Sequence, residues 1–140
     1  MRADSVDLPM NEGQPLIFVV DDEAAVRTAL RRLLESADLA VETFSGGEDL
    51  LASLPTQEPA CVVLDLHMLG MSGFDVQERL AETHANVPVI IMTGNDSPEA
   101  KDTALRGGAS DYLRKPICDG VLLDAISSAI AASVHHPTGS

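Results

Sequence analysis

The stretch Leu16-Ile17-Phe18-Val19-Val20-Asp21-Asp22 decides how this chain folds, because five apolar residues lead directly into two aspartates. A short apolar run that ends at a polar residue is typical of a strand buried on both faces, as in a parallel sheet. In open α/β sheets, ligands bind just outside the carboxyl ends of such strands. The same pattern recurs in residues 61–64 before Asp65, in residues 89–92 before Thr93, and in residues 111–113 before Arg114, Lys115 and Pro116.

The composition limits the classes of function. A chain of 140 residues, 45% hydrophobic and 22% charged, fits one globular domain that can bury a core without disulfides. A formal net charge of −13 disfavours direct nucleic-acid binding, which depends on Lys and Arg. We find neither a membrane span nor a signal peptide. Cys61 and Cys118 should lie at opposite ends of the sheet and stay reduced, so we expect a cytoplasmic protein.

Helical segments are predicted between the strands. Residues 23–37 carry apolar side chains on one face and turn Arg27, Arg31, Arg32 and Glu35 largely toward water. Residues 39–44 predict a less buried strand. The other expected helices run from an N-cap at Ser45 to Ser53, from an N-cap at Ser72 to Thr83, from Ser97-Pro98-Glu99 to Gly107-Gly108, and over residues 119–132 with Val121, Leu122, Ala125, Ile126, Ala129 and Ile130 on one face.

This order is strand then helix, repeated five times. It predicts an α/β fold with a doubly wound five-stranded parallel sheet and helices on both faces. We expect a flexible lead-in at residues 1–14, one domain over residues 15–132 and a disordered tail at residues 133–140. The helix after Ser97 has only Ala100, Ala104 and Leu105 as apolar anchors. A helix that buries so little should be held weakly and is a candidate for movement.

The polar residues at the strand ends favour phosphate chemistry. Asp21 and Asp22 alone would be read as an exposed turn, but the strand that ends at Asp65 should lie beside theirs. Close like charges need a raised pKa or a cation, and an all-oxygen site favours magnesium. Asp65 could then act as a nucleophile that forms an acyl phosphate. Thr93 would supply a hydroxyl donor and Lys115 a positive charge for the phosphoryl oxygens.

Four motifs together carry a family resemblance. They are residues 19–23 (VVDDE), 64–73 (LDLHMLGMSG), 92–94 (MTG) and 107–116 (GGASDYLRKP). On these motifs the chain resembles the receiver domain of two-component response regulators over about residues 14–132. Within that family it is most similar to the nitrogen-fixation regulator type, whose members usually carry a helix-turn-helix output domain. Leu69 stands where the family usually has proline, which removes a φ restraint from the loop after Asp65.

The resemblance implies a flavodoxin-like fold with strand order 2-1-3-4-5. It implies that a histidine kinase or phosphotransfer protein phosphorylates Asp65. It also implies that Asp22 and Asp65 ligate Mg²⁺ directly, Asp21 through water, and His67 through its backbone carbonyl. Thr93 and Tyr112 would act as switch residues that change the surface of the fourth helix, fifth strand and fifth helix. A cis peptide bond is expected at Lys115-Pro116.

Alternatives remain at three levels. The main hypothesis is a signalling switch that catalyses only its own phosphorylation and dephosphorylation, with an unknown downstream protein target. The chain is either a stand-alone receiver or the receiver half of a DNA-binding regulator whose output domain is absent from this chain. Its oligomeric state is either a monomer or a phosphorylation-dependent dimer. A phosphohydrolase of the haloacid dehalogenase type would need an aspartate where His67 stands. His67 and Asn95 could set the lifetime of the phosphate.

Overall fold

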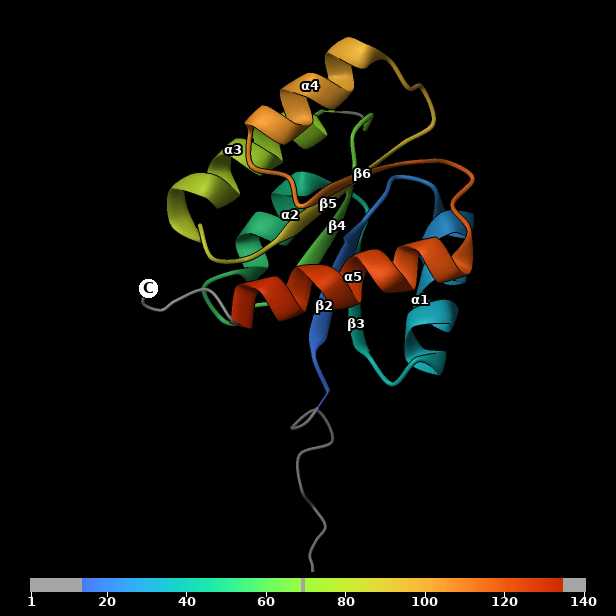
Figure 1. Ribbon diagram of the computed structural model, residues 1–140. Helices are drawn as coiled ribbons and strands as arrows, with labels where there is room; N and C mark the ends of the chain where they lie inside the picture. Colours follow the sequence, from blue (N-terminus) through green and yellow to red (C-terminus); the bar gives the residue numbers. More distant parts are fainter. Residues whose placement is uncertain (1–13, 69, 135–140) are drawn as a thin grey trace, which may run out of the picture.

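The computed structural model describes residues 14–68 and 70–134 (Figure 1). Its strands are β2 (Leu16–Val20), β3 (Ala40–Phe44), β4 (Cys61–Asp65), β5 (Val89–Thr93) and β6 (Asp111–Arg114). These five strands run parallel in the order β3-β2-β4-β5-β6, which is the predicted order 2-1-3-4-5. The central strands β4 and β5 are fully buried, whereas β3 at one edge is partly exposed, as predicted.

Five helices cover the sheet on both faces (Figure 1). Leu34 of one helix and Ile126 of another lie in the core on one face, whereas Leu50, Val76 and Ala104 lie in the core on the other. The helices are α1 (Ala24–Ser36), α2 (Gly47–Ser53), α3 (Gly73–Thr83), α4 (Pro98–Arg106) and α5 (Asp119–Val134). Helices α1 and α5 therefore cover one face, and α2, α3 and α4 the other.

Local capping chemistry accounts for two helix starts. The Ser72 side chain accepts from the backbone N–H of Asp75, and the Asp75 side chain accepts from that of Ser72, which completes a capping box for α3. At α4 the Ser97 hydroxyl accepts from the N–H of Ala100 at 3.0 Å, and Pro98 occupies the first turn. Both starts confirm the prediction.

The predicted N-cap at Ser45 is wrong. Gly46 holds that position in an extended conformation, and no side chain caps α2. The helix starts at Gly47, where an added Cβ would overlap Val76 of α3. Helix α2 thus starts without a serine cap, at a glycine that packs too closely against α3 to carry a side chain.

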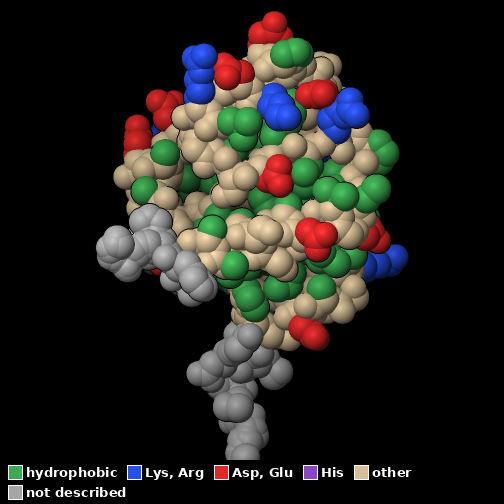
Figure 2. Space-filling view, in the orientation of Figure 1, with side chains coloured by type: hydrophobic (Ala, Val, Ile, Leu, Met, Phe, Trp, Pro, Cys, Tyr) green, Lys and Arg blue, Asp and Glu red, His purple; other side chains and the backbone are tan. Residues whose placement is uncertain are grey.

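Two apolar side chains lie outside the core that the sequence predicted for them. Val121 of α5 is 50% exposed and Leu105 of α4 is 45% exposed. The buried positions of α5 are Leu122, Ala125, Ile126 and Ala129, so Val121 falls beside the buried stripe. Figure 2 shows hydrophobic side chains at the surface around α5, with acidic and basic ones scattered among them.

The predicted ends of the domain lie largely outside the described residues. Helix α5 continues to Val134, past the predicted end at Ala132, while most of the predicted lead-in and tail, and Leu69, fall where nothing is described. Among the described helices, none is long and apolar enough to cross a membrane.

Candidate functional site

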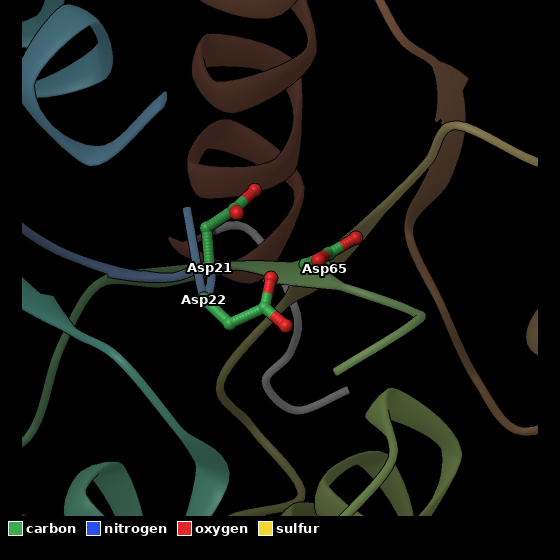
Figure 3. A group of neighbouring side chains, drawn as sticks. All are labelled: Asp21, Asp22 and Asp65. Atoms are coloured by element: carbon green, nitrogen blue, oxygen red, sulfur yellow. The ribbon is translucent and has the colours of Figure 1, made fainter. Parts of the chain in front are cut away.

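Three carboxylates meet at the carboxyl ends of two neighbouring strands. Asp21 and Asp22 follow β2, and Asp65 ends β4, which pairs with β2 in the register Val20↔Leu64. One oxygen from each carboxylate lies within 4.8 Å of the others. Figure 3 shows Asp21 and Asp22 leaving the chain in opposite directions beside Asp65. The predicted convergence of these carboxylates is confirmed.

Lys115 brings a positive charge into this acidic group. Its Nζ lies 2.7 Å from Asp21 Oδ2 and 3.4 Å from Asp65 Oδ1, and its side chain is 19% exposed. Glu23 Oε1 lies at 3.7 Å. Burial acts to lower the pKa of Lys115, but the Asp21 and Asp65 carboxylates outweigh burial and hold this pKa above its ordinary value. The lysine therefore stays charged and neutralises part of the site.

Asp21 is fixed through every polar atom that it has. Its N–H donates to the carbonyl oxygen of Phe44, and its own carbonyl oxygen accepts from Arg27 at 2.7 Å. Its Oδ1 accepts from the backbone N–H of Glu23 at 2.9 Å, and its Oδ2 accepts from Lys115. The residue is fully buried. Both carboxylate oxygens of Asp21 are therefore held in place by hydrogen bonds from the protein.

Asp65 is a buried carboxylate whose pKa is raised by its surroundings. It is 3% exposed. Burial first, and then the charges of Asp21 and Asp22, raise the pKa of Asp65 to about 6, although Lys115 opposes them. A divalent cation would relieve this repulsion. The all-oxygen donor set, with Asp22 exposed and Asp65 at the edge of the sheet, fits Mg²⁺.

The predicted switch residues lie on the next two strands. Thr93 ends β5 and is fully buried, and its Oγ1 accepts from the N–H of Asn95 at 3.0 Å. Tyr112 of β6 is 9% exposed, and its buried hydroxyl has no hydrogen-bond partner among the described residues. Burial raises the pKa of the Tyr112 phenol, and the Asp96 carboxylate raises it further. The Tyr112 side chain is thus almost completely buried in this structure.

The backbone on either side of the site is tightly constrained. Gly73 N–H donates to the carbonyl oxygen of Leu66 at 2.9 Å, and a Cβ added to Gly73 would lie 2.7 Å from the carbonyl oxygen of Asp65. On the opposite side the Lys115 N–H donates to the carbonyl oxygen of Thr93 at 2.7 Å. The Lys115-Pro116 peptide bond is cis, as predicted.

Sequence reasoning missed the contacts of two arginines of α1. Arg27 and Arg31 were expected to face water, but both are half-buried. Arg27 donates to the carbonyl oxygen of Asp21 at the site, whereas Arg31 donates to that of Val41 in β3, away from the site. Glu23 belongs to the quoted acidic motif, but its position near Lys115 was not predicted. The cavity at the site is lined by Asp22, Glu23, Asp65, His67, Gly94, Asn95 and Lys115.

Comparison with known proteins agrees with this geometry. Residues 17–127 match the family described as "Response regulator receiver domain". Nodulation protein W of Bradyrhizobium diazoefficiens is 37% identical over 81% of this chain and 50% of that protein. Transcriptional regulatory protein FixJ of the same organism is 38% identical over 81% of this chain and 56% of that protein. The chain thus spans about half the length of these relatives.

A solved structure supports the fold independently. The crystal structure of a response regulator receiver domain protein (CheY-like) from Methanospirillum hungatei JF-1 aligns with a TM-score of 0.84. The alignment covers 89% of this chain and 99% of that one at 23% identity. At this identity the likeness establishes the shared architecture of sheet and helices.

Proposed function

The chain belongs to the response regulator receiver domain family, and on that premise we propose that it is a phosphorylation-controlled switch of a two-component system. Asp65 would accept a phosphoryl group from a histidine kinase or a phosphotransfer protein. The observation that carries the proposal is the group of Asp21, Asp22 and Asp65 at the strand ends, with Lys115 Nζ 3.4 Å from Asp65. Relatives of FixJ and NtrC type support the predicted likeness to the nitrogen-fixation regulator type.

In the proposed transfer, an oxygen of Asp65 attacks the phosphorus of a phosphohistidine. The new O–P bond forms as the N–P bond breaks, and the electron pair returns to the imidazole of the partner. Mg²⁺ held by Asp22, Asp65 and the His67 carbonyl, with Asp21 reached through water, would screen the charge that the phosphoryl group brings. Lys115 would bind a phosphoryl oxygen. The ionised form of Asp65 is the nucleophile, so its raised pKa makes the cation important for activation.

The response to phosphorylation would pass through Thr93 and Tyr112. Thr93 Oγ1 accepts a hydrogen bond from Asn95 and can donate its own proton to a phosphoryl oxygen. The loop from Gly94 to Ser97 connects Thr93 to α4, so a shift of the hydroxyl would be felt at the start of that helix. We propose that the surface of α4, β6 and α5 changes as a result, with Tyr112 fixed inward in the phosphorylated state.

The cellular context follows from the family rather than from this site. We propose a cytoplasmic protein whose kinase and downstream target are other proteins, and whose state is monomeric or a phosphorylation-dependent dimer. Relatives named as transcriptional regulators are about twice as long as the matched region. The second candidate is therefore the receiver half of a DNA-binding regulator, in which phosphorylation would control an attached output domain. We propose no catalysis beyond its own phosphorylation and dephosphorylation.

Intact-mass measurement tests the proposal. The protein is incubated with a small-molecule phosphodonor, with Mg²⁺ or with a chelator, and is compared with Asp65→Asn and with Asp124→Asn, an exposed control on α5. One added phosphoryl group is expected on the wild type and the control only with Mg²⁺, and none on Asp65→Asn. A phosphoryl adduct that forms equally on Asp65→Asn would refute the assignment. If no adduct appears, absence of Mg²⁺-dependent beryllofluoride binding would refute it as well.

A further inference from the structure

Helix α4 is held to the domain by very little apolar surface. Of its nine residues, all of which the structure describes, Ala104 is the one that is buried. Leu105, the largest apolar side chain of the helix, is 45% exposed. Apolar burial alone therefore gives α4 little stabilisation, so any polar contact with the domain has a large share in fixing its position.

One such contact crosses from α3 to α4. Gln77 of α3 is 4% exposed, and its Nε2 donates to the carbonyl oxygen of Ala104 at 2.7 Å. The same carbonyl accepts from the N–H of Ala109 at 3.1 Å. If the Gln77 amide moved away, the Ala104 carbonyl would therefore stay paired, whereas the displaced amide would need another partner.

Gly107 provides the room for this amide. A Cβ added there would lie 2.9 Å from Gln77 Nε2 and 3.0 Å from its Cδ. The backbone of Gly107 has φ −75° and ψ 0°, a conformation open to any residue. The glycine is therefore not needed for the turn, and its missing side chain leaves space for the amide. A small cavity lined in part by Gln77, Leu80 and Gly107 lies next to this contact.

Helix α3 also connects this contact to the proposed phosphorylation site. Gly73, the first residue of α3, packs against the backbone of Asp65 so closely that no Cβ fits. Gln77 lies four residues later, one turn along the same helix and on the same side. A displacement of the backbone around Asp65 would therefore be carried by α3 to the amide that holds α4.

We propose that Gln77 is a latch that fixes the carboxyl-terminal end of α4 and opens when Asp65 is phosphorylated. The opening step deepens the proposed function and rests on it. The holding step does not, because it concerns the protein without phosphate. In the latched state the amide donates to Ala104. In the open state it lies in the neighbouring cavity or in water, and α4 is free to move.

Hydrogen exchange of the backbone amides in residues 99–108 tests the holding step. Gln77→Met removes the donor but keeps a long, flexible side chain, and Gly107→Ala displaces the amide without removing it. Each variant should exchange about five- to tenfold faster in α4, as expected when one hydrogen bond is lost. The double variant should be no faster than the faster single variant. Glu78→Gln, an exposed change on the same helix, should leave α4 unchanged.

Unchanged exchange of α4 in both single variants would overturn the latch, and so would additive effects in the double variant. The opening step is tested by repeating the measurement with Mg²⁺ and beryllofluoride. The exchange rate of wild-type α4 should then approach the rate of Gln77→Met without beryllofluoride. The exchange rate of α4 in the variant should change little. Bound beryllofluoride without a change in wild-type α4 would overturn the opening step alone. Failure to bind beryllofluoride would count against the proposed function. The holding step would still be decided by hydrogen exchange in the variants without beryllofluoride.

Discussion

Replacing Asp65 with asparagine should stabilise the metal-free protein at neutral pH. Asp65 is 3% exposed, and its pKa is raised from 3.8 to about 6 by burial and by the neighbouring aspartates. The folded protein therefore binds a proton at Asp65 more tightly than the unfolded chain does. The stabilisation that comes from this bound proton is complete below about pH 4 and is lost as the pH rises through about 6.

The size of the effect follows from this difference in pKa. A change from 3.8 to about 6 corresponds to about 3 kcal/mol of unfolding free energy at neutral pH. Asparagine removes the cost of the buried charge, but Lys115 then loses a carboxylate at 3.4 Å. We therefore expect a net gain of about 1–2 kcal/mol for Asp65→Asn at about pH 7.5, and almost none at about pH 4.

Urea unfolding in the presence of a chelator measures the difference at both pH values. Asp124→Asn, an exposed substitution on α5, is the matched control and should stay within about 0.5 kcal/mol of the wild type. Added Mg²⁺ should stabilise the wild type and leave Asp65→Asn nearly unchanged, because the variant lacks a charged ligand. A variant less stable than the wild type at about pH 7.5, or a difference that does not depend on pH, would refute the electrostatic argument.

Three further changes have defined outcomes. Lys115→Ala leaves the fully buried carboxylate of Asp21 without its cation and should lower the unfolding free energy by about 3 kcal/mol, as measured in urea at neutral pH. Gly73→Ala places a Cβ 2.7 Å from a backbone oxygen and should cost at least about 2 kcal/mol in the same assay, with weaker Mg²⁺ binding by calorimetry. Alkylation of the native protein should modify exposed Cys118 and spare Cys61, whose pKa burial raises to about 12; a rapid second adduct by intact mass would contradict this.

Much of the architecture could be predicted because its signals are local. The apolar runs before Asp21 and Asp65 specify buried parallel strands, and the serines at positions 72 and 97 cap α3 and α4. The meeting of the carboxylates follows from a general rule, because parallel strands present their carboxyl ends at one edge of the sheet. Residue type and order were therefore sufficient for the central part of the site.

Other features depend on partners that leave no mark in the sequence. Arg27 and Gln77 both donate to backbone carbonyl oxygens, and every residue has such an acceptor. A helical pattern places Arg27 on the polar side of α1 but cannot show that the loop after β2 lies within its reach. The close approach of Gly47 to Val76 of α3 is likewise a tertiary contact that the sequence around Ser45 does not show.

Among the described residues, the sheet separates the interior into two cores that have no buried side chain in common. Tyr112 and Ala104 belong to the core beneath α2, α3 and α4, while Leu113 and Ile126 belong to the core beneath α1 and α5. The sheet thus lies between two separate layers of packed side chains. A change in packing around Ala104 on one face therefore involves a different set of core side chains from the set that packs around Leu34 and Ile126 on the other.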